Sequence, residues 1–267
     1  MCTTTVRRIH YDSVRQEYYR DTANEPEFRS ALAQAFACHG NERVFTFSVN
    51  GDLFYVKQRQ KHHKRLRLRF NRLQGDGYMQ ELKKLMLAFE RCEAAPEMVL
   101  GTRDYFVTRG NGKPLQQLIK PEVSDEITNR AFYSAGCVLS RLHESGLTHG
   151  RPVLRDIAYN QEQDKAVLLD WENTHEFSFI APCSLDIILF LHGYFREEIN
   201  RPAAIKAAIE GYLSEPNGKV RFMEARSVLL KKSRLIKLFK LFDRFGWIDL
   251  QAVTRAYDYL LTVEIPS

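Results

Sequence analysis

The chain has 267 residues, of which 39 are Lys or Arg and 33 are Asp or Glu, so its formal net charge is +6. Hydrophobic residues make up 44% of the sequence, which is typical of a globular protein and excludes wholesale disorder. The modest basic excess is compatible with an anionic partner such as a nucleotide, a phospholipid surface or nucleic acid, and it does not choose among them.

The cysteines and the apolar segments limit the cellular setting. The five cysteines are scattered and include no Cys-x-x-Cys pair, which argues against zinc and redox motifs and against a secreted disulfide framework. The N-terminal residues lack the apolar core of a signal peptide. The longest apolar stretch, 187–191, is far shorter than the ~20 residues that a membrane span needs. We therefore expect a soluble, cytoplasmic protein, and peripheral contact with the inner face of the membrane stays open.

The first third of the chain predicts a helix, a strand hairpin and a second helix. Residues 27–38 place alanines, leucine and phenylalanine at helical spacing. Residues 44–49 and 53–57 are strand-like and flank Asn50-Gly51-Asp52, a strong hairpin signal. Residues 78–92 have the apolar spacing of an amphipathic helix.

The remaining elements are mostly helical. Two strand-like segments, 98–100 and 105–108, precede a glycine-rich break at 109–113. Ser124 can cap a long helix that runs to about Glu144. A short buried strand is expected at 166–169, directly before Asp170. Helices are expected at 185–198, at 203–213 and from 221 to the end.

This order of elements predicts an α+β fold with two lobes. A small β-rich N-lobe with one main helix would comprise residues 1–110. A larger helical C-lobe would comprise residues 111–267, with the boundary near 109–112.

Four features follow one another in the order that phosphoryl transfer from ATP requires. Such a site needs a strand lysine for the phosphates, a helix glutamate that orients it, and two oxygen ligands for Mg²⁺. Lys57 ends the strand LFYVK, and Glu81 lies in the next helix, with Glu90 as a rival on the same helix. The segment LHESGLTHGRPVLRDIAYN, residues 142–160, has the form of a catalytic loop. The segment AVLLDWEN, residues 166–173, has the form of a strand that ends in a metal-binding Asp.

On these residues the chain resembles the protein-kinase-like superfamily. Within it, the chain is most similar to the small bacterial lipopolysaccharide core kinases, Kdo kinases and aminoglycoside-type phosphotransferases. The resemblance spans residues 44–191 and implies a bilobal protein-kinase-like fold with ATP and Mg²⁺ as cofactors. It implies that Lys57 holds the phosphates, that Glu81 orients Lys57 and that Asp170 binds the metal.

The resemblance also implies structural roles for three residues. His149 packs and hydrogen-bonds the catalytic loop, Trp171 replaces the Phe of the D-F-G element as a core aromatic, and Asp186 braces the loop from its helix. The glycine-rich phosphate loop of the family has only His39-Gly40-Asn41 as a counterpart here.

The register of the catalytic loop decides the remaining roles. Aligning the His-Gly-Arg sequence at 149–151 with the His-Arg-Asp of the family puts Arg151 at the general base and Asp156 at the metal-binding Asn. The alternative aligns Arg-Asp at 155–156, which makes Asp156 the base and leaves Asn160 one residue short of the metal position. We prefer the first register because it follows directly from the LHxxGLxHG lead-in.

Arg151 therefore occupies the position where the family has the Asp that accepts the substrate proton, and an arginine stays protonated at neutral pH. In the first hypothesis the chain is an ATP- and Mg²⁺-dependent phosphotransferase. It would act on a hydroxyl of a lipopolysaccharide-type glycolipid, a protein or a small molecule. Arg151 would supply charge stabilisation near the acceptor, and Glu172 is a carboxylate that could assist. In the second hypothesis the chain is a pseudokinase that binds nucleotide and acts as a scaffold or regulator.

A basic run from Lys57 to Arg72 follows the predicted hairpin. Apolar residues alternate with arginines over 65–70, which suits an extended segment on an anionic acceptor or a membrane surface. A solvated loop is the plain alternative. The chain has no recognised nucleic-acid-binding module, so no specific nucleic acid is predicted. A third hypothesis, a basic membrane or nucleic-acid adaptor, predicts salt-sensitive anion binding that does not depend on ATP.

Overall fold

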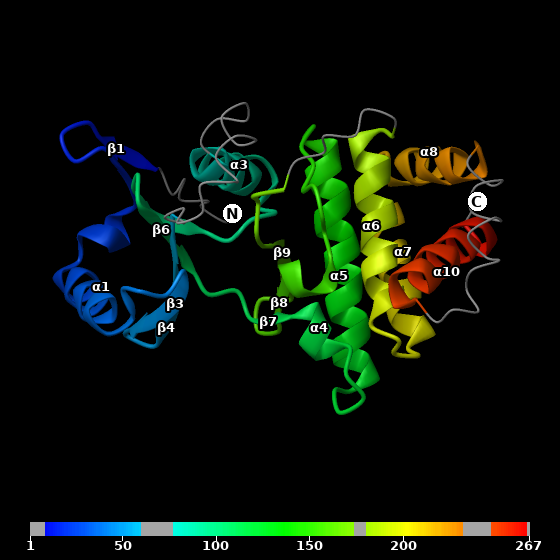
Figure 1. The fold of residues 1–267 in the computed structure, drawn as a ribbon, viewed down its shortest axis with the longest axis horizontal. Coiled ribbons are helices and arrows are strands. Elements are labelled where there is room, and N and C mark those ends of the chain that lie inside the picture. The colour runs from blue at the N-terminus through cyan, green and yellow to red at the C-terminus, as the bar shows by residue number, and fades with distance from the viewer. Residues whose placement is uncertain (1–8, 60–76, 174–179, 232–246, 266–267) are drawn as a thin grey trace, which may run out of the picture. The chain divides into compact units, whose positions relative to one another are not determined.

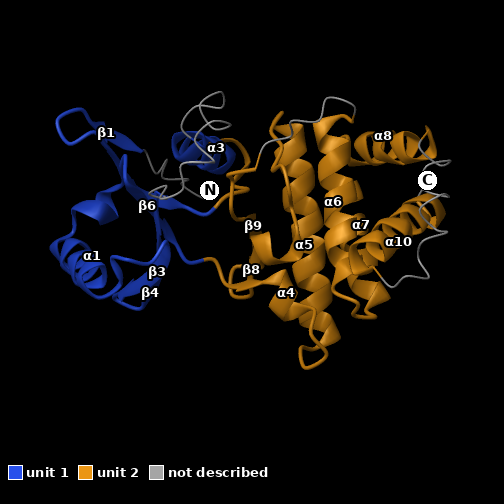
Figure 2. Cartoon of the chain, viewed as in Figure 1, with its two compact units in different colours: residues 1–89, 96–110 blue, residues 90–95, 111–267 orange. Residues whose placement is uncertain are grey.

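The computed structural model describes residues 9–59, 77–173, 180–231 and 247–265. The chain forms two compact units, which Figure 2 colours separately. The first unit comprises residues 1–89 and 96–110, and the second comprises residues 90–95 and 111–267.

The first unit contains a six-stranded antiparallel sheet (Figure 1). Its strands, in their order across the sheet, are β1 (His10–Asp12), β2 (Glu17–Tyr19), β5 (Met98–Gly101), β6 (Tyr105–Arg109), β4 (Asp52–Gln58) and β3 (Val44–Val49). Asn50 and Gly51 join β3 to β4 and have φ values of 53° and 88°. Left-handed backbone at both turn positions matches the twist of the flanking strands, so the hairpin predicted from Asn-Gly is confirmed.

Helix α1 (Pro26–His39) packs on one face of this sheet. Residues of β3 alternate between exposed and buried, and the buried ones include Phe45 and Phe47. Phe28 of α1 packs edge-on to Phe47, with the ring centroids 5.3 Å apart. Edge-on aromatic pairs of this kind stabilise a core beyond the burial of their area. The buried side chains of β3 thus pack against the apolar side of α1.

Helix α3 (Gly77–Cys92) meets β4 on the opposite face. Successive side chains of a strand point to opposite sides of a sheet. Val56 is fully buried in the core beneath α1. Lys57, the next residue, therefore points away from α1, and its side chain contacts Glu81 of α3.

The second unit is mainly helical and carries a small antiparallel sheet. Its strands are β7 (Lys113–Pro114), β8 (Ile157–Asn160) and β9 (Lys165–Leu168). Its helices are α4 (Leu115–Leu118), α5 (Asp125–Glu144), α6 (Pro182–Arg196), α7 (Pro202–Ser214), α8 (Gly218–Lys231) and α10 (Ile248–Thr262). Helix α5 packs against α7 and against β9. Residues 90–95 join this unit at β9, where the Leu168 N–H donates to the Ala94 carbonyl at 2.7 Å.

The C-terminal end of α5 leads the chain into the predicted catalytic loop. Gly146 has a φ of 79°, and its N–H donates to the His143 carbonyl. The Leu147 N–H donates to the Leu142 carbonyl. These two hydrogen bonds form a Schellman motif, which ends a helix at a left-handed glycine. The predicted stop near Gly146 is confirmed, and the loop at 149–151 begins three residues later.

The α+β character of the chain is confirmed, as are most of the predicted elements. The sequence analysis did not predict β1, β2, β7 or β8. Only the first three residues of the basic run from Lys57 to Arg72 are described, and the part after Arg59 lies outside the described residues. Within the ranges that the structure describes, no helix is both long and apolar enough to cross a membrane.

Candidate functional site

Lys57 and Glu81 form an ion pair that links a strand to the helix after it. Lys57 Nζ lies 2.5 Å from Glu81 Oε1, and the two side chains are 15% and 4% exposed. Two charges with so little exposure remain ionised because each compensates the other. The rival Glu90 is exposed at the other end of the helix. The sequence therefore identified the correct partner for Lys57 on α3.

His149 is fully buried in the second unit, in the loop after α5. Burial lowers the pKa of its imidazole below the usual 6.5, so the ring is neutral at pH 7. The Nε2–H donates to the Leu169 carbonyl at 2.6 Å, and Nδ1 accepts from the Arg151 N–H at 3.3 Å. The ring also meets Trp171 edge-on, at 4.9 Å between centroids. His149 thus joins the loop after α5 to the segment after β9.

Asp186 of α6 holds the same loop from the other side and has no exposed surface. Its carboxylate accepts from the His149 N–H at 2.7 Å and from the Gly150 N–H at 2.9 Å. It is also 3.2 Å from His143 Nε2 on α5, and His143 Nδ1 is 2.7 Å from the Tyr212 hydroxyl on α7. Burial raises the pKa of Tyr212, so its hydroxyl keeps its proton and donates.

This buried network ties three helices to one loop. The sequence analysis gave Asp186 its bracing role but missed His143 and Tyr212. Both are ordinary polar residues within amphipathic helices, and no local pattern marks them, because the contact depends on how α5, α6 and α7 pack.

Gly150 allows the loop to approach the segment after β9 closely. Its φ is 104°, a conformation that L side chains rarely adopt. A Cβ atom at this position would lie 2.6 Å from the Asn173 carbonyl oxygen. Any larger residue would therefore push residues 170–173 away from the loop.

Arg151, Asp156 and Asp170 lie together in the second unit. The Nη2 atom of Arg151 is 3.6 Å from Asp156 Oδ2 and 3.9 Å from Asp170 Oδ2. Asp156 ends a short 3₁₀ turn, Leu154–Asp156, and its carbonyl accepts from the Leu169 N–H at 2.7 Å. That hydrogen bond joins the backbone of Asp156 to the residue before Asp170.

Asp170 has an unusual backbone conformation. Its φ of 60° is in the left-handed region, which costs a residue other than glycine about 1–3 kcal/mol. The neighbouring hydrogen bonds of Leu169 and His149 hold the chain in this conformation. Strain of this kind is concentrated at functional sites, where it aims a side chain.

Asn160 has a different task from the one that the alternative register would give it. It ends β8, and its Oδ1 accepts from the N–H groups of Glu162 and Gln163 at 2.9 and 3.1 Å. This side chain stabilises the turn between β8 and β9. Asp156, which the preferred register makes the metal ligand, lies instead beside the same guanidinium nitrogen as Asp170.

The donor set of Asp156 and Asp170 fits a hard divalent cation. Mg²⁺ is usually bound by one or two carboxylates and takes its other ligands from phosphates and water. The guanidinium that lies near both carboxylates shows that this place favours positive charge. Among the described residues, no group of three His, Cys, Asp or Glu side chains could hold a metal without such outside ligands.

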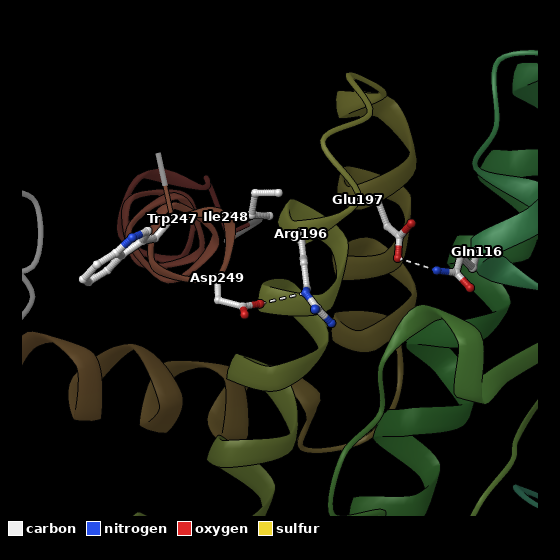
Figure 3. Close-up of a pocket in the computed structure, with 6 residues that line it drawn as sticks. All are labelled: Gln116, Arg196, Glu197, Trp247, Ile248 and Asp249. Carbon is white, nitrogen blue, oxygen red and sulfur yellow. Dashed lines mark hydrogen bonds and ion pairs between the residues drawn. The ribbon is translucent and has the colours of Figure 1, made fainter. Parts of the chain in front are cut away.

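A surface hollow of about 700 Å³ lies elsewhere on the second unit (Figure 3). Arg196 at the end of α6 is 2.7 Å from Asp249 of α10, and Gln116 of α4 donates to Glu197 at 2.9 Å. Four of the lining residues are thus paired with one another. None of the residues that the sequence predicted for the site lines it.

No family model matches the sequence. The chain is similar to a protein of Haemophilus influenzae that carries the description "Uncharacterized protein". The two are 24% identical over 237 residues, which cover 82% of this chain and 96% of that protein.

Proposed function

We propose that the protein is an ATP- and Mg²⁺-dependent phosphotransferase with a bilobal protein-kinase-like fold. The observation that carries this proposal is the ion pair between Lys57 and Glu81. A partly buried lysine on a strand, oriented by a glutamate of the next helix, is the arrangement that kinases use to hold nucleotide phosphates. Asp156 and Asp170 follow in the order that the same chemistry needs.

Each residue has a distinct role in this proposal. Lys57 donates to phosphate oxygens, and Glu81 keeps the ammonium group in place. Asp156 and Asp170 would hold Mg²⁺, which neutralises charge on the phosphates when it is bound. Arg151 donates to the transferring phosphoryl group or to an anionic acceptor and stabilises charge that develops there.

Arg151 cannot accept the proton of the acceptor hydroxyl. Phosphoryl transfer passes through a loose transition state, in which positioning and charge neutralisation do most of the catalytic work. A general base therefore contributes less to this reaction than positioning and charge neutralisation do. Glu172, which is exposed two residues after Asp170, is the carboxylate that we propose to assist.

The proposed acceptor is a hydroxyl on a sugar of a lipopolysaccharide-type glycolipid, on a protein or on a small molecule. The proposed location is the cytoplasm, including the inner face of the membrane. A glycolipid acceptor would explain why the chain is basic overall, since such lipids are anionic.

One observation favours a second candidate function, a pseudokinase that binds nucleotide and acts as a scaffold or regulator. Arg151 lies at the position of the general base, and its guanidinium is near both proposed metal ligands. In this alternative the nucleotide binds without being turned over.

Thermal unfolding with MgATP, together with ADP release over a panel of acceptors, tests both candidates. For the phosphotransferase we expect ADP release and a rise in Tm of about 5 °C or more at MgATP concentrations near 100 times Kd. Both effects should vanish in Asp170→Ala and persist in Glu162→Gln, which removes a carboxylate from the exposed β8–β9 turn. A Tm rise without ADP release on any acceptor would favour the pseudokinase. No rise at all would overturn nucleotide binding.

A further inference from the structure

The guanidinium of Arg151 lies beside both carboxylates that the proposed function assigns to the metal. A single atom, Nη2, lies within 4 Å of a carboxylate oxygen of both Asp156 and Asp170. Arg155 differs, because it approaches only Asp156, at 3.5 Å, and its side chain is 56% exposed. Arg151 is therefore the one arginine of this pair that contacts both proposed metal ligands.

A metal ion and this guanidinium repel each other when both are near the two carboxylates. The side chains of Asp156, Asp170 and Arg151 are 9%, 26% and 39% exposed, so water screens the repulsion only in part, least at Asp156. Arginine is protonated at every pH at which the protein is folded, so the competing charge is permanent. Only movement of the side chain can remove it.

We propose that Arg151 is a tethered cation that keeps divalent metal off Asp156 and Asp170 until a phosphate-bearing ligand draws it away. A guanidinium group binds a phosphate as it binds a carboxylate, through two parallel N–H···O hydrogen bonds. The phosphates of a nucleotide would thus take over Arg151 and release the two carboxylates for the metal. This inference rests on the proposed function in taking Asp156 and Asp170 as the metal ligands and a nucleotide as the phosphate-bearing ligand.

Titration of the full-length protein with Mn²⁺ alone, in the absence of nucleotide, tests the inference by calorimetry. We expect weak binding to the wild type and a Kd at least about tenfold lower in Arg151→Gln, because a charge near 4 Å contributes energies of that order. Arg155→Gln is the matched control, and we expect its Kd to change less than about threefold. Adding Asp170→Asn to Arg151→Gln should abolish the gain and thereby locate the metal.

Arg151→Lys provides a second variant if the glutamine variant does not fold. Its ammonium group is more strongly hydrated than a guanidinium and sits on a flexible stem, so it should stay beside the two carboxylates less firmly, and Mn²⁺ should bind more tightly than to the wild type, by a smaller factor. An unchanged or weaker Mn²⁺ affinity in these variants would overturn the inference. Failure of the wild type to bind ATP, with tighter Mn²⁺ binding in Arg151→Gln, would overturn the proposed function and the release of Arg151 by nucleotide, and would leave standing the exclusion of metal by Arg151.

Discussion

At the scale of single residues, burial fixes the protonation state of His149 and makes the folded protein sensitive to acid. The pKa of His149 is lowered by burial, whereas the same residue in the unfolded chain titrates near 6.5. Below pH 6.5 the unfolded state therefore binds the proton and the folded state does not. The free energy of unfolding should fall by about 1.4 kcal/mol per pH unit from this group, until the folded-state pKa is reached.

Urea unfolding of the wild type and His149→Gln from pH 5.0 to 7.5 checks this prediction. The difference in unfolding free energy between them should be constant above pH 7 and shrink as the pH falls below 6.5. A difference that does not vary with pH would mean that His149 binds its proton equally well in the folded and unfolded states, and would contradict this prediction.

The ion pair between Lys57 and Glu81 predicts a non-additive effect on stability. Lys57→Met leaves a nearly buried carboxylate without its lysine, and we expect a loss of about 3 kcal/mol. Glu81→Leu should cost a similar amount. The double variant replaces both charges by apolar groups of similar size, so it should be more stable than either single variant. Urea unfolding of the four proteins measures the coupling, and additive losses would contradict it.

At the scale of elements, the helices and strands that could be predicted are those whose ends carry a capping residue or a turn residue. Ser124 caps α5, with its Oγ accepting from the Ile127 N–H at 3.4 Å, and Gly146 ends the helix. Strands β1 and β2 were missed because each has only three residues and little apolar alternation. Strand β8 was missed because its residues were assigned to the catalytic loop, and only pairing with β9 makes them a strand.

The contact between α5 and α7 gives a prediction at this scale, because glycines let the two helices approach closely. A Cβ atom on Gly136 would lie 1.9 Å from the carbonyl oxygen of Ala208. A Cβ atom on Gly211 would lie 2.1 Å from the carbonyl oxygen of Tyr133. Backbone atoms cannot yield as a flexible side chain can. Gly136→Ala or Gly211→Ala should therefore destabilise the protein by about 3 kcal/mol or more, as overpacking does.

The matched control for these variants is Gly146→Ala, at the end of α5. A Cβ atom there would meet nothing within 4 Å, and only its left-handed φ of 79° opposes the change. We expect a loss nearer 1 kcal/mol. Equal losses at Gly136 and Gly146, measured by urea unfolding, would mean that helix contact does not limit the residue at 136.

At the scale of the whole molecule, the chain order of the candidate site was predictable and its internal support was not. Motif spacing identified Lys57, Asp156 and Asp170, because each follows a recognisable strand or loop pattern. The network of Asp186, His143 and Tyr212 joins helices that are far apart in the sequence. Its formation depends on tertiary packing, which a single sequence does not display.

The proposed function also requires that two residues far apart in the chain, Lys57 and Asp170, act on one ligand. If Lys57 holds the phosphates and Asp170 holds the metal bound to them, each residue loses most of its effect once the other is gone. We therefore expect Lys57→Met and Asp170→Asn each to weaken MgATP binding at least about tenfold, and the double variant to be little weaker than either. Calorimetric titration of the four proteins measures this coupling. Losses that multiply would mean that the two residues contribute independently, and would contradict this coupling.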